Sequence, residues 1–329
     1  MDNAGNRFTG AIRGTVGAYA NSIFRFGDQL SASFLQSQGD LWYGALNYSM
    51  PIGYSGLRSN FSYSRADYEL GKEYSALGAH GRAEILSAGL KYPIIRSRKS
   101  NLSISTTYNH KWFTDKQDSI LSRNKKSSDS LPIAFNFDKT DSALGGGVTY
   151  GFFSWTHGIL DLGQNLNNID KTTAKSNGNF DKFNFDVSRI QSLPVQNLSF
   201  FARTVGQVAL NNLDSSERFG LGGINSVRAY PTGESYGDEG IIGQAELRYT
   251  IRNFSPFALY DLGHIKTSHK PFSTGANQRT IGGAGFGLRL NQRNWNASGS
   301  IAWRTVGSKS LSDNKAKTPT IWFNVGYSF

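Results

Sequence analysis

Glu239 to Ile251 reads EGIIGQAELRYTI, and this stretch decides the fold. Its residues alternate: one parity is apolar or small, and the other is mostly polar or charged. Successive side chains of a strand point to opposite faces of a sheet, so we predict a strand with one apolar face and one polar face. The first parity comprises Ile241, Gly243, Ala245, Leu247, Tyr249 and Ile251, and the second comprises Ile242, Gln244, Glu246, Arg248 and Thr250.

A glycine-rich segment precedes this strand. Phe219 to Tyr230 reads FGLGGINSVRAY and carries one cation, Arg228, between apolar neighbours. Pro231, Gly233 and the sequence GDEG at 237–240 follow it. The pattern predicts a long loop that holds a single arginine and leads directly into an amphipathic strand.

The composition fits a transmembrane β-barrel better than a soluble domain. The 329 residues have a mean hydropathy of −0.41 and contain no apolar run long enough for a membrane-spanning helix. Aromatic residues make up 13% of the chain, there are 37 glycines, and helical periodicity is nearly absent. A chain that is polar on average, aromatic, glycine-rich and alternating is typical of an outer-membrane barrel. The single expected domain is 1–329.

The charge and the lack of cysteine agree with this class. The net charge is +11, but the cations are scattered singly, which argues against nucleic-acid binding. A basic pore lining, or loops that meet acidic lipid headgroups, fits better. A barrel closes its own hydrogen bonds, so the absence of cysteines, and hence of disulfides, is no obstacle.

Alternating segments bounded by turn residues predict about 15 antiparallel strands. The connections between them are alternately short and long, with one exception near 37–39. Short connections are typical of periplasmic turns and long ones of outer loops. We expect strands near 7–20, 28–37, 40–50, 56–69, 82–94, 100–115, 130–138, 142–155, 179–192, 197–209, 239–251, 254–263, 278–290, 293–306 and 319–329.

The order of the connections predicts one further strand. The last strand follows a long loop and therefore ends on the periplasmic side, whereas the first leads into a short turn and begins outside. Barrels of this class have even strand counts. We interpret the parity as a natural barrel of sixteen strands, with the first lying upstream of Asp2; the alternative is that one strand is wrongly divided. Asp2-Asn3-Ala4 after Met1 is no signal peptide, which suggests a mature or truncated piece.

The final segment and the tryptophans also suit a barrel. Residues 320–329 alternate and end on an aromatic, which is typical of the signal that outer-membrane assembly machinery recognises; its residues are Phe323, Tyr327 and Phe329. The six tryptophans fall in or at the ends of predicted strands, as interface girdles would place them. A soluble β-sandwich is the alternative, but it would need shorter strands and two packed inner faces.

The region 216–263 resembles the outer-membrane transporters of two-partner secretion, the TpsB-type proteins of the haemolysin and haemagglutinin secretion-activation family. The resemblance is carried by LGG at 221–223, SVRAY at 226–230, GDEG at 237–240, ELRY at 246–249 and LYDLG at 259–263. The opening DNAGN at 2–6 and the C-terminal phenylalanine extend it over the chain. Ala229 departs from the usual glycine, and Leu259 from the usual aromatic.

The resemblance implies a barrel of sixteen strands with a long sixth loop folded into the lumen. It also implies upstream POTRA domains, a plug helix and a first strand, none of which has a counterpart here. In the family the loop arginine pairs with an acid on the inner wall, which would be Arg228 with Asp261. The expected loop anchor is therefore Val227, Arg228, Ala229 and Tyr230, and the expected wall partners are Asp261 and Gly263.

The function implied is export of a partner exoprotein from the periplasm to the cell surface, in the bacterial outer membrane and without a cofactor or metal. The partners would be that exoprotein, outer-membrane lipid and the barrel-assembly machinery. The lumen should be wet and polar, and its candidate lining is Arg13, Arg203, Gln207, Gln244, Glu246, Arg248 and Arg289.

Three other functions remain open. A barrel-assembly insertase would need more POTRA domains, and a passive porin would conduct ions without a partner. A barrel lipid hydrolase is the enzymatic alternative. GESYG at 233–237 has the Gly-x-Ser-x-Gly spacing, but it precedes a predicted strand and not the helix that a nucleophile elbow requires, and the chain has no zinc spacing. Glycine runs at 145–147 and 282–285 are expected inside strands, so neither suits a phosphate-binding loop.

Overall fold

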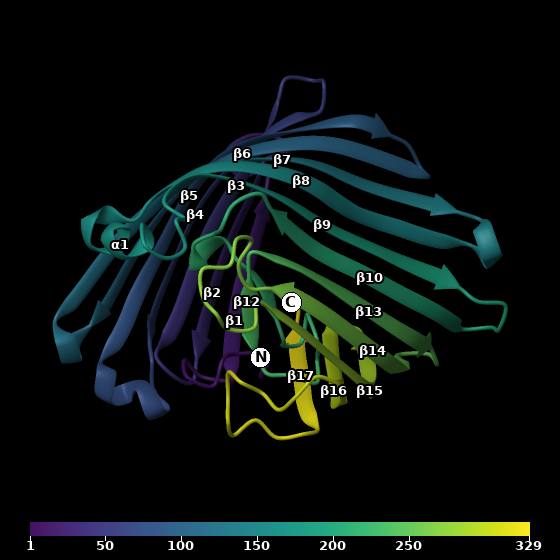
Figure 1. The fold of residues 1–329 in the computed structure, drawn as a ribbon. Helices are drawn as coiled ribbons and strands as arrows, with labels where there is room; N and C mark the ends of the chain where they lie inside the picture. The colour runs from purple at the N-terminus through teal and green to yellow at the C-terminus, as the bar shows by residue number, and fades with distance from the viewer.

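The computed structural model describes residues 1–329 and shows one sheet of fifteen antiparallel strands curving round a lumen (Figure 1). Each strand pairs with the next along the chain, except that β10 pairs with β13, and this confirms the predicted all-β barrel class. The strands are β1 (Arg13–Asn21), β2 (Gln29–Ser37), β3 (Leu41–Ile52), β4 (Leu57–Glu69), β5 (Ala79–Arg96), β6 (Ser100–Gln117), β7 (Ser122–Asp141), β8 (Gly147–Asp161), β9 (Gly178–Ser192), β10 (Leu198–Ala209), β13 (Glu239–Tyr249), β14 (Phe254–Lys266), β15 (Gln278–Gln292), β16 (Trp295–Val306) and β17 (Thr320–Tyr327).

The connection between β10 and β13, residues 210–238, is the longest and will be called loop six. It contains a separate two-stranded hairpin, β11 (Phe219–Leu221) with β12 (Ser235–Gly237). Figure 1 shows this hairpin within the curve of the sheet rather than at its outer edge. The α-helix, α1 (Gly163–Asp170), lies in another connection, between β8 and β9. No helix in the structure has the length and apolarity needed to cross a bilayer.

The strands show the alternation expected of a wall between lipid and water. In β14, Phe254, Tyr260 and Leu262 are exposed on the outer face, whereas Phe257 and Asp261 are buried on the inner face. The larger of two buried apolar clusters lies between loop six and the inner wall formed by β13 to β16. It comprises Leu221, Val227, Ala229 and Tyr230 from the loop with Ile242, Phe257, Leu259, Ile265, Ile281 and Ala302 from the strands.

Three strands, β1, β7 and β8, have ends that differ from the prediction. The strand expected at 130–138 extends over 122–141 as β7, and its connection to β6 is short. Residues 122–129 are polar on both parities, so they carry no apolar alternation by which a strand is recognised. The glycine run 145–147 was wrongly placed inside a strand: Gly145 and Gly146 lie in a turn with φ of +97° each, and β8 begins at Gly147. The first strand begins at Arg13, not near Arg7.

The first and last strands do not pair with each other. Met1 to Asn3 lies between them at the end of the long loops and bonds to both: Asp2 exchanges two backbone hydrogen bonds with Arg13 (2.9 and 2.8 Å), and Val325 donates to the Met1 carbonyl (2.8 Å). Asp2 is antiparallel to β1 and to β17 at once. Below it the facing edges of β1 and β17 form a seam whose backbone groups are unpaired within the sheet.

Candidate functional site

The tip of loop six is folded on itself by glycines and one serine. Gly222 and Gly223 have φ of +89° and +100°, and a Cβ at Gly222 would lie 2.3 Å from the Pro231 carbonyl oxygen, so a side chain is excluded there. The Ser226 hydroxyl accepts a hydrogen bond from the Gly222 amide (3.0 Å), and the Gly223 amide donates to the Tyr230 carbonyl (3.0 Å). The turn presents Val227 to Tyr230 towards the inner wall.

Arg228 contacts Asp261 of β14 through three hydrogen bonds. Its Nη2 donates to Asp261 Oδ1 (2.7 Å), and both its Nε (2.8 Å) and its backbone amide (3.0 Å) donate to Oδ2. Asp261 is fully buried and Arg228 is 5% exposed. Bidentate guanidinium–carboxylate pairs are among the strongest and most directional polar contacts in proteins.

A second carboxylate, Glu246 of β13, completes the ion-pair cluster. Arg228 Nη1 donates to its Oε1, while Arg248 Nε (2.8 Å) and Arg289 Nη2 (2.9 Å) contact Oε2. Glu246 is therefore held by three guanidinium groups, whereas the only ion pair of Asp261 is with Arg228. Arg248 and Arg289 also stack 4.0 Å over the rings of Phe201 and Phe257. These contacts fix both arginines on the wall even without the loop.

The backbone of the tip is bonded to the last strands of the sheet. Trp322 Nε1 of β17 donates to the Arg228 carbonyl (2.7 Å), and Thr320 Oγ1 donates to that of Ala229 (3.0 Å). The Tyr230 hydroxyl lies 2.9 Å from the carbonyl oxygens of Val306 and Ser308. The tip thus connects β13 and β14 with β16 and β17 along one stretch of the inner wall.

Two wall glycines admit the tip at close range. A Cβ at Gly263 would lie 3.0 Å from Val227 Cγ2, and a Cβ at Gly283 would lie 2.3 Å from the Cβ of Ala229. Both positions face inward on strands β14 and β15. The tip reaches the backbone of the wall because these two residues have no side chain.

The beginning of loop six has a separate set of ion pairs, with strands β6, β7 and β9 of the same sheet. Glu217, 4% exposed, contacts Lys182 of β9 (2.9 Å) and Lys111 of β6, and Lys126 of β7 contacts Asp214 (2.6 Å). Burial raises the pKa of Glu217, but attraction to Lys182 and Lys111 outweighs it, so the pKa is lowered. These pairs are charged at neutral pH, and their stabilisation is lost only as the pH falls through that lowered pKa.

The end of loop six is held by a third buried carboxylate. Glu234, 4% exposed, pairs with Arg279 of β15 and accepts hydrogen bonds from the Leu311 amide (2.8 Å) and the Ser312 hydroxyl (2.7 Å). Burial raises the pKa of Glu234, but these donors and Ser310 outweigh it and lower the pKa. Neither Glu217 nor Glu234 was among the residues expected from the sequence.

The structure brings most of the expected lining residues against loop six. Gln244 donates to the Ser226 carbonyl (2.8 Å), Gln207 to the Glu217 carbonyl (3.0 Å), and Arg203 pairs with Asp186 (2.6 Å) beside Asn225. Arg13 lies elsewhere, at the seam, where it pairs with Asp2 (2.9 Å). Phe323, Tyr327 and Phe329 are at the end of the chain, and the Tyr327 ring packs edge-on against those of Trp295 and Phe329.

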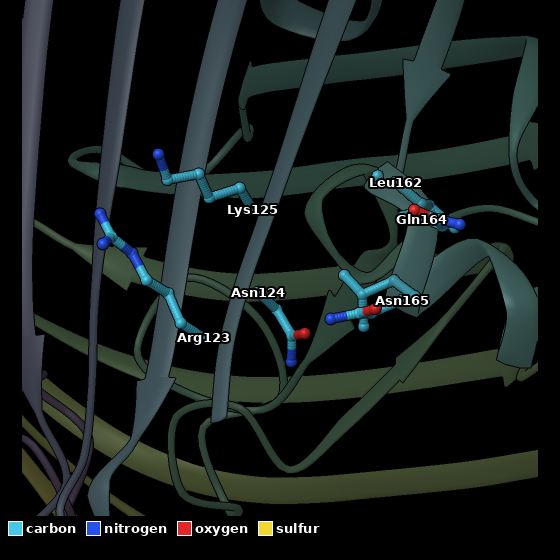
Figure 2. A pocket seen from close by; sticks show the side chains of 8 residues that line it. Arg123, Asn124, Lys125, Leu162, Gln164 and Asn165 are labelled. Carbon is cyan, nitrogen blue, oxygen red and sulfur yellow. The ribbon is translucent and has the colours of Figure 1, made fainter. Parts of the chain in front are cut away.

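Two cavities are lined mainly by polar side chains. One cavity, of about 400 Å³, is lined by Arg123, Asn124 and Lys125 of β7 and by residues at the start of α1. Figure 2 shows the side chains of Arg123 and Lys125 pointing away from Gln164 and Asn165. Another, of about 250 Å³, lies against Arg228 and Glu246. No three His, Asp or Glu side chains gather as metal ligands would.

The fold and this cluster define a class: a transmembrane β-barrel with a long loop bonded to its inner wall. Residues 1–290 match the family of haemolysin secretion/activation proteins ShlB/FhaC/HecB, and the chain belongs to that family. It is therefore an outer-membrane protein.

Relatives agree with this assignment. The Heme/hemopexin transporter protein HuxB of Haemophilus influenzae strain 86-028NP is 30% identical over 331 residues, which cover 95% of this chain and 56% of the relative. The protein of the same name from strain Rd is 29% identical over 325 residues, with the same coverage. The chain thus spans about half the length of the curated relatives it matches.

Solved structures share the fold. CdiB from Escherichia coli matches with a TM-score of 0.79 at 19% identity, covering 100% of this chain and 61% of that one. CdiB from Acinetobacter baumannii matches with 0.74 at 21%, covering 100% and 59%. BamA from Haemophilus ducreyi lacking POTRA domains 1–3 matches with 0.66 at 14%, covering 98% and 71%.

Proposed function

We propose that this chain is the pore of a two-partner secretion transporter, which passes an unfolded exoprotein from the periplasm to the cell surface. The observation that supports the proposal is the docking of Arg228 on Asp261 and Glu246, on the inner wall of a barrel of this family. We propose that loop six thereby lies across the lumen. Such a protein performs no covalent chemistry. Its work is to hold a passage closed and to open it for an extended chain.

The loop contacts suggest how the passage is kept closed. Loop six is bonded at its beginning to β6, β7 and β9, at its tip to β13 and β14, and at its end to β15. We propose that the tip is the part that moves, because Glu246 keeps Arg248 and Arg289 when Arg228 leaves. Polar walls then face the exoprotein, and Gln244 and Arg203 offer hydrogen bonds that an extended chain exchanges easily with water.

We also propose that the wall is completed at the seam. Backbone groups that are unpaired in a bilayer cost several kcal/mol each, so membrane barrels are closed. One extended segment, antiparallel to both β1 and β17 and continuous with Met1 to Asn3, would close this one as a sixteenth strand. POTRA domains from the same upstream part would capture the exoprotein. Phe323, Tyr327 and Phe329 would be read by the assembly machinery.

The test is export in a host that lacks two-partner secretion. The full-length protein that contains this chain is expressed with the exoprotein encoded beside its gene, and the exoprotein is measured in the medium and on the surface. We expect it outside only when the barrel is present. Assembly of other barrels without export would indicate an insertase, ion conductance without export a porin, and lipid cleavage by the purified protein a hydrolase.

A further inference from the structure

Exposed cations lie at the end of the barrel that carries the short turns, and six of them are considered together. They lie in, or within three residues of, five different turns: β1–β2, β5–β6, β7–β8, β13–β14 and β15–β16; Lys139 is in β7 itself, and the other five are in turns. Each is exposed to solvent. They will be called the basic belt and are Arg25, Arg98, Lys99, Lys139, Arg252 and Arg293.

No partner within the chain neutralises the basic belt. None of its side chains forms one of the ion pairs, hydrogen bonds or ring-stacking contacts that hold Arg228, Arg248 and Arg289. The three aspartates at this end are already engaged. Asp28 accepts hydrogen bonds from three turn amides and Tyr48, Asp138 accepts from Asn101 (2.9 Å), and Asp141 pairs with Arg189 (2.9 Å).

Exposed apolar side chains lie beside these cations. Phe24 and Phe26 flank Arg25 and are 75% and 92% exposed. Ile251 and Phe254 flank Arg252, and Trp295 follows Arg293 by two residues; all three are exposed on the outer face of the barrel. Lys139 continues the outward row of Phe135 and Phe137 in β7. The cations therefore stand where the apolar outer face ends.

We infer that the basic belt binds the headgroups of anionic glycerophospholipids in the leaflet that the short turns face. Rows of aromatic side chains ending in cations match the border between acyl chains and phosphates. An acidic protein domain would contact only part of the barrel's rim, whereas these cations are spread over five hairpins. The exposed apolar side chains between them are also better accommodated by lipid than by water. The inference goes beyond export and depends on the barrel class alone.

The experiment measures which lipids leave the membrane with the protein. The full-length protein is extracted from outer membranes in polymer-bounded native nanodiscs, and the ratio of phosphatidylglycerol and cardiolipin to phosphatidylethanolamine is determined by mass spectrometry. Arg98→Glu with Lys99→Glu removes part of the belt. Lys171→Glu with Lys175→Glu, two exposed lysines in the connection that follows α1 at the other end, changes the total charge equally.

We expect the wild type to retain a higher proportion of anionic lipid than the membrane contains. In the belt variant this excess should fall by at least about fivefold, which is the factor for one cation at an anionic surface. The control variant keeps it. Arg98→Gln with Lys99→Gln repeats the loss without charge reversal, and heat-modifiable migration on gels shows that each barrel is folded. Unchanged retention in the belt variants, or equal loss in the control, overturns the inference. Export measured in the same cells reports separately on the proposed function.

Discussion

Replacing Arg228 with glutamine is expected to abolish most export while the barrel still assembles. The substitution leaves Asp261 fully buried with no other cation in contact. Removing one partner of a buried ion pair typically costs about 3–5 kcal/mol, because the remaining charge is uncompensated. That is enough to release the tip of loop six but leaves the hydrogen bonds between strands intact. Exoprotein in the medium and heat-modifiable migration of the barrel are the two measurements.

The two partners are not equivalent, and this sharpens the test. Asp261→Asn leaves Arg228 paired with Glu246, so its effect on export should be smaller than that of Arg228→Gln. Combining the two substitutions removes the uncompensated charge and should be milder than the sum of the single effects. Arg248→Gln is the matched control, because it removes a guanidinium from Glu246 but none from the loop. Normal export by Arg228→Gln would contradict the anchoring role.

Replacing Gly283 with alanine is expected to displace the loop tip without changing any charge. The added methyl group would lie 2.3 Å from the Cβ of Ala229, well inside van der Waals contact. Overpacking of this kind typically costs about 1–3 kcal/mol. We expect export to fall and the tip to become accessible to protease. The rate of tryptic cleavage after Arg228, in protein folded in detergent, measures the displacement.

Ala229→Gly provides the rescue for this variant. It removes the methyl group that Gly283→Ala meets, so the double variant should regain most of the protection, although the contact with the Trp303 carbonyl (2.9 Å) remains. Gly243→Ala is the control: it faces outward on β13, with nothing within 4 Å of its added Cβ. If Ala229→Gly restores nothing, the tip does not pack on Gly283 as described.

The sequence predicts the wall better than the loop. Twelve of the strands were recognised with ends close to those observed, because lipid on one face and water on the other impose an alternation that each strand carries alone. The prediction for β7 was too short because Ser122 to Asp129 is polar on both faces of the strand. The apolar alternation that identifies a strand begins only after Asp129. Gly145 and Gly146 were misplaced because a turn and a strand bend both favour glycine.

The contacts of the loop depend on long-range geometry. The pairing of Arg228 with Asp261 was expected from the resemblance and is a contact in the structure, whereas Glu246 was expected only as lining. The register could have indicated it, since Gln244 lies opposite Asp261 and Glu246 is two residues further on the same face. Glu217 gave no such signal, because its partner Lys111 is 106 residues away, on β6.

The central claim is that the tip of loop six lies against the inner wall, and a disulfide tests it most directly. The chain has no cysteine of its own. A Cβ at Gly263 would lie 3.0 Å from Val227 Cγ2, and a disulfide places each sulfur about 3 Å from the partner's Cβ. Val227→Cys with Gly263→Cys should therefore cross-link in assembled barrels. Val227→Cys with Gly243→Cys, whose second thiol faces lipid, should not.

The measurement is the mobility of the unreduced protein on a gel, read together with export. The account predicts a cross-link in the first pair only, with export stopped by oxidation and restored by reductant. An assembled barrel in which Cys at 227 and 263 stay reduced under oxidising conditions, or in which both pairs cross-link equally, would contradict it.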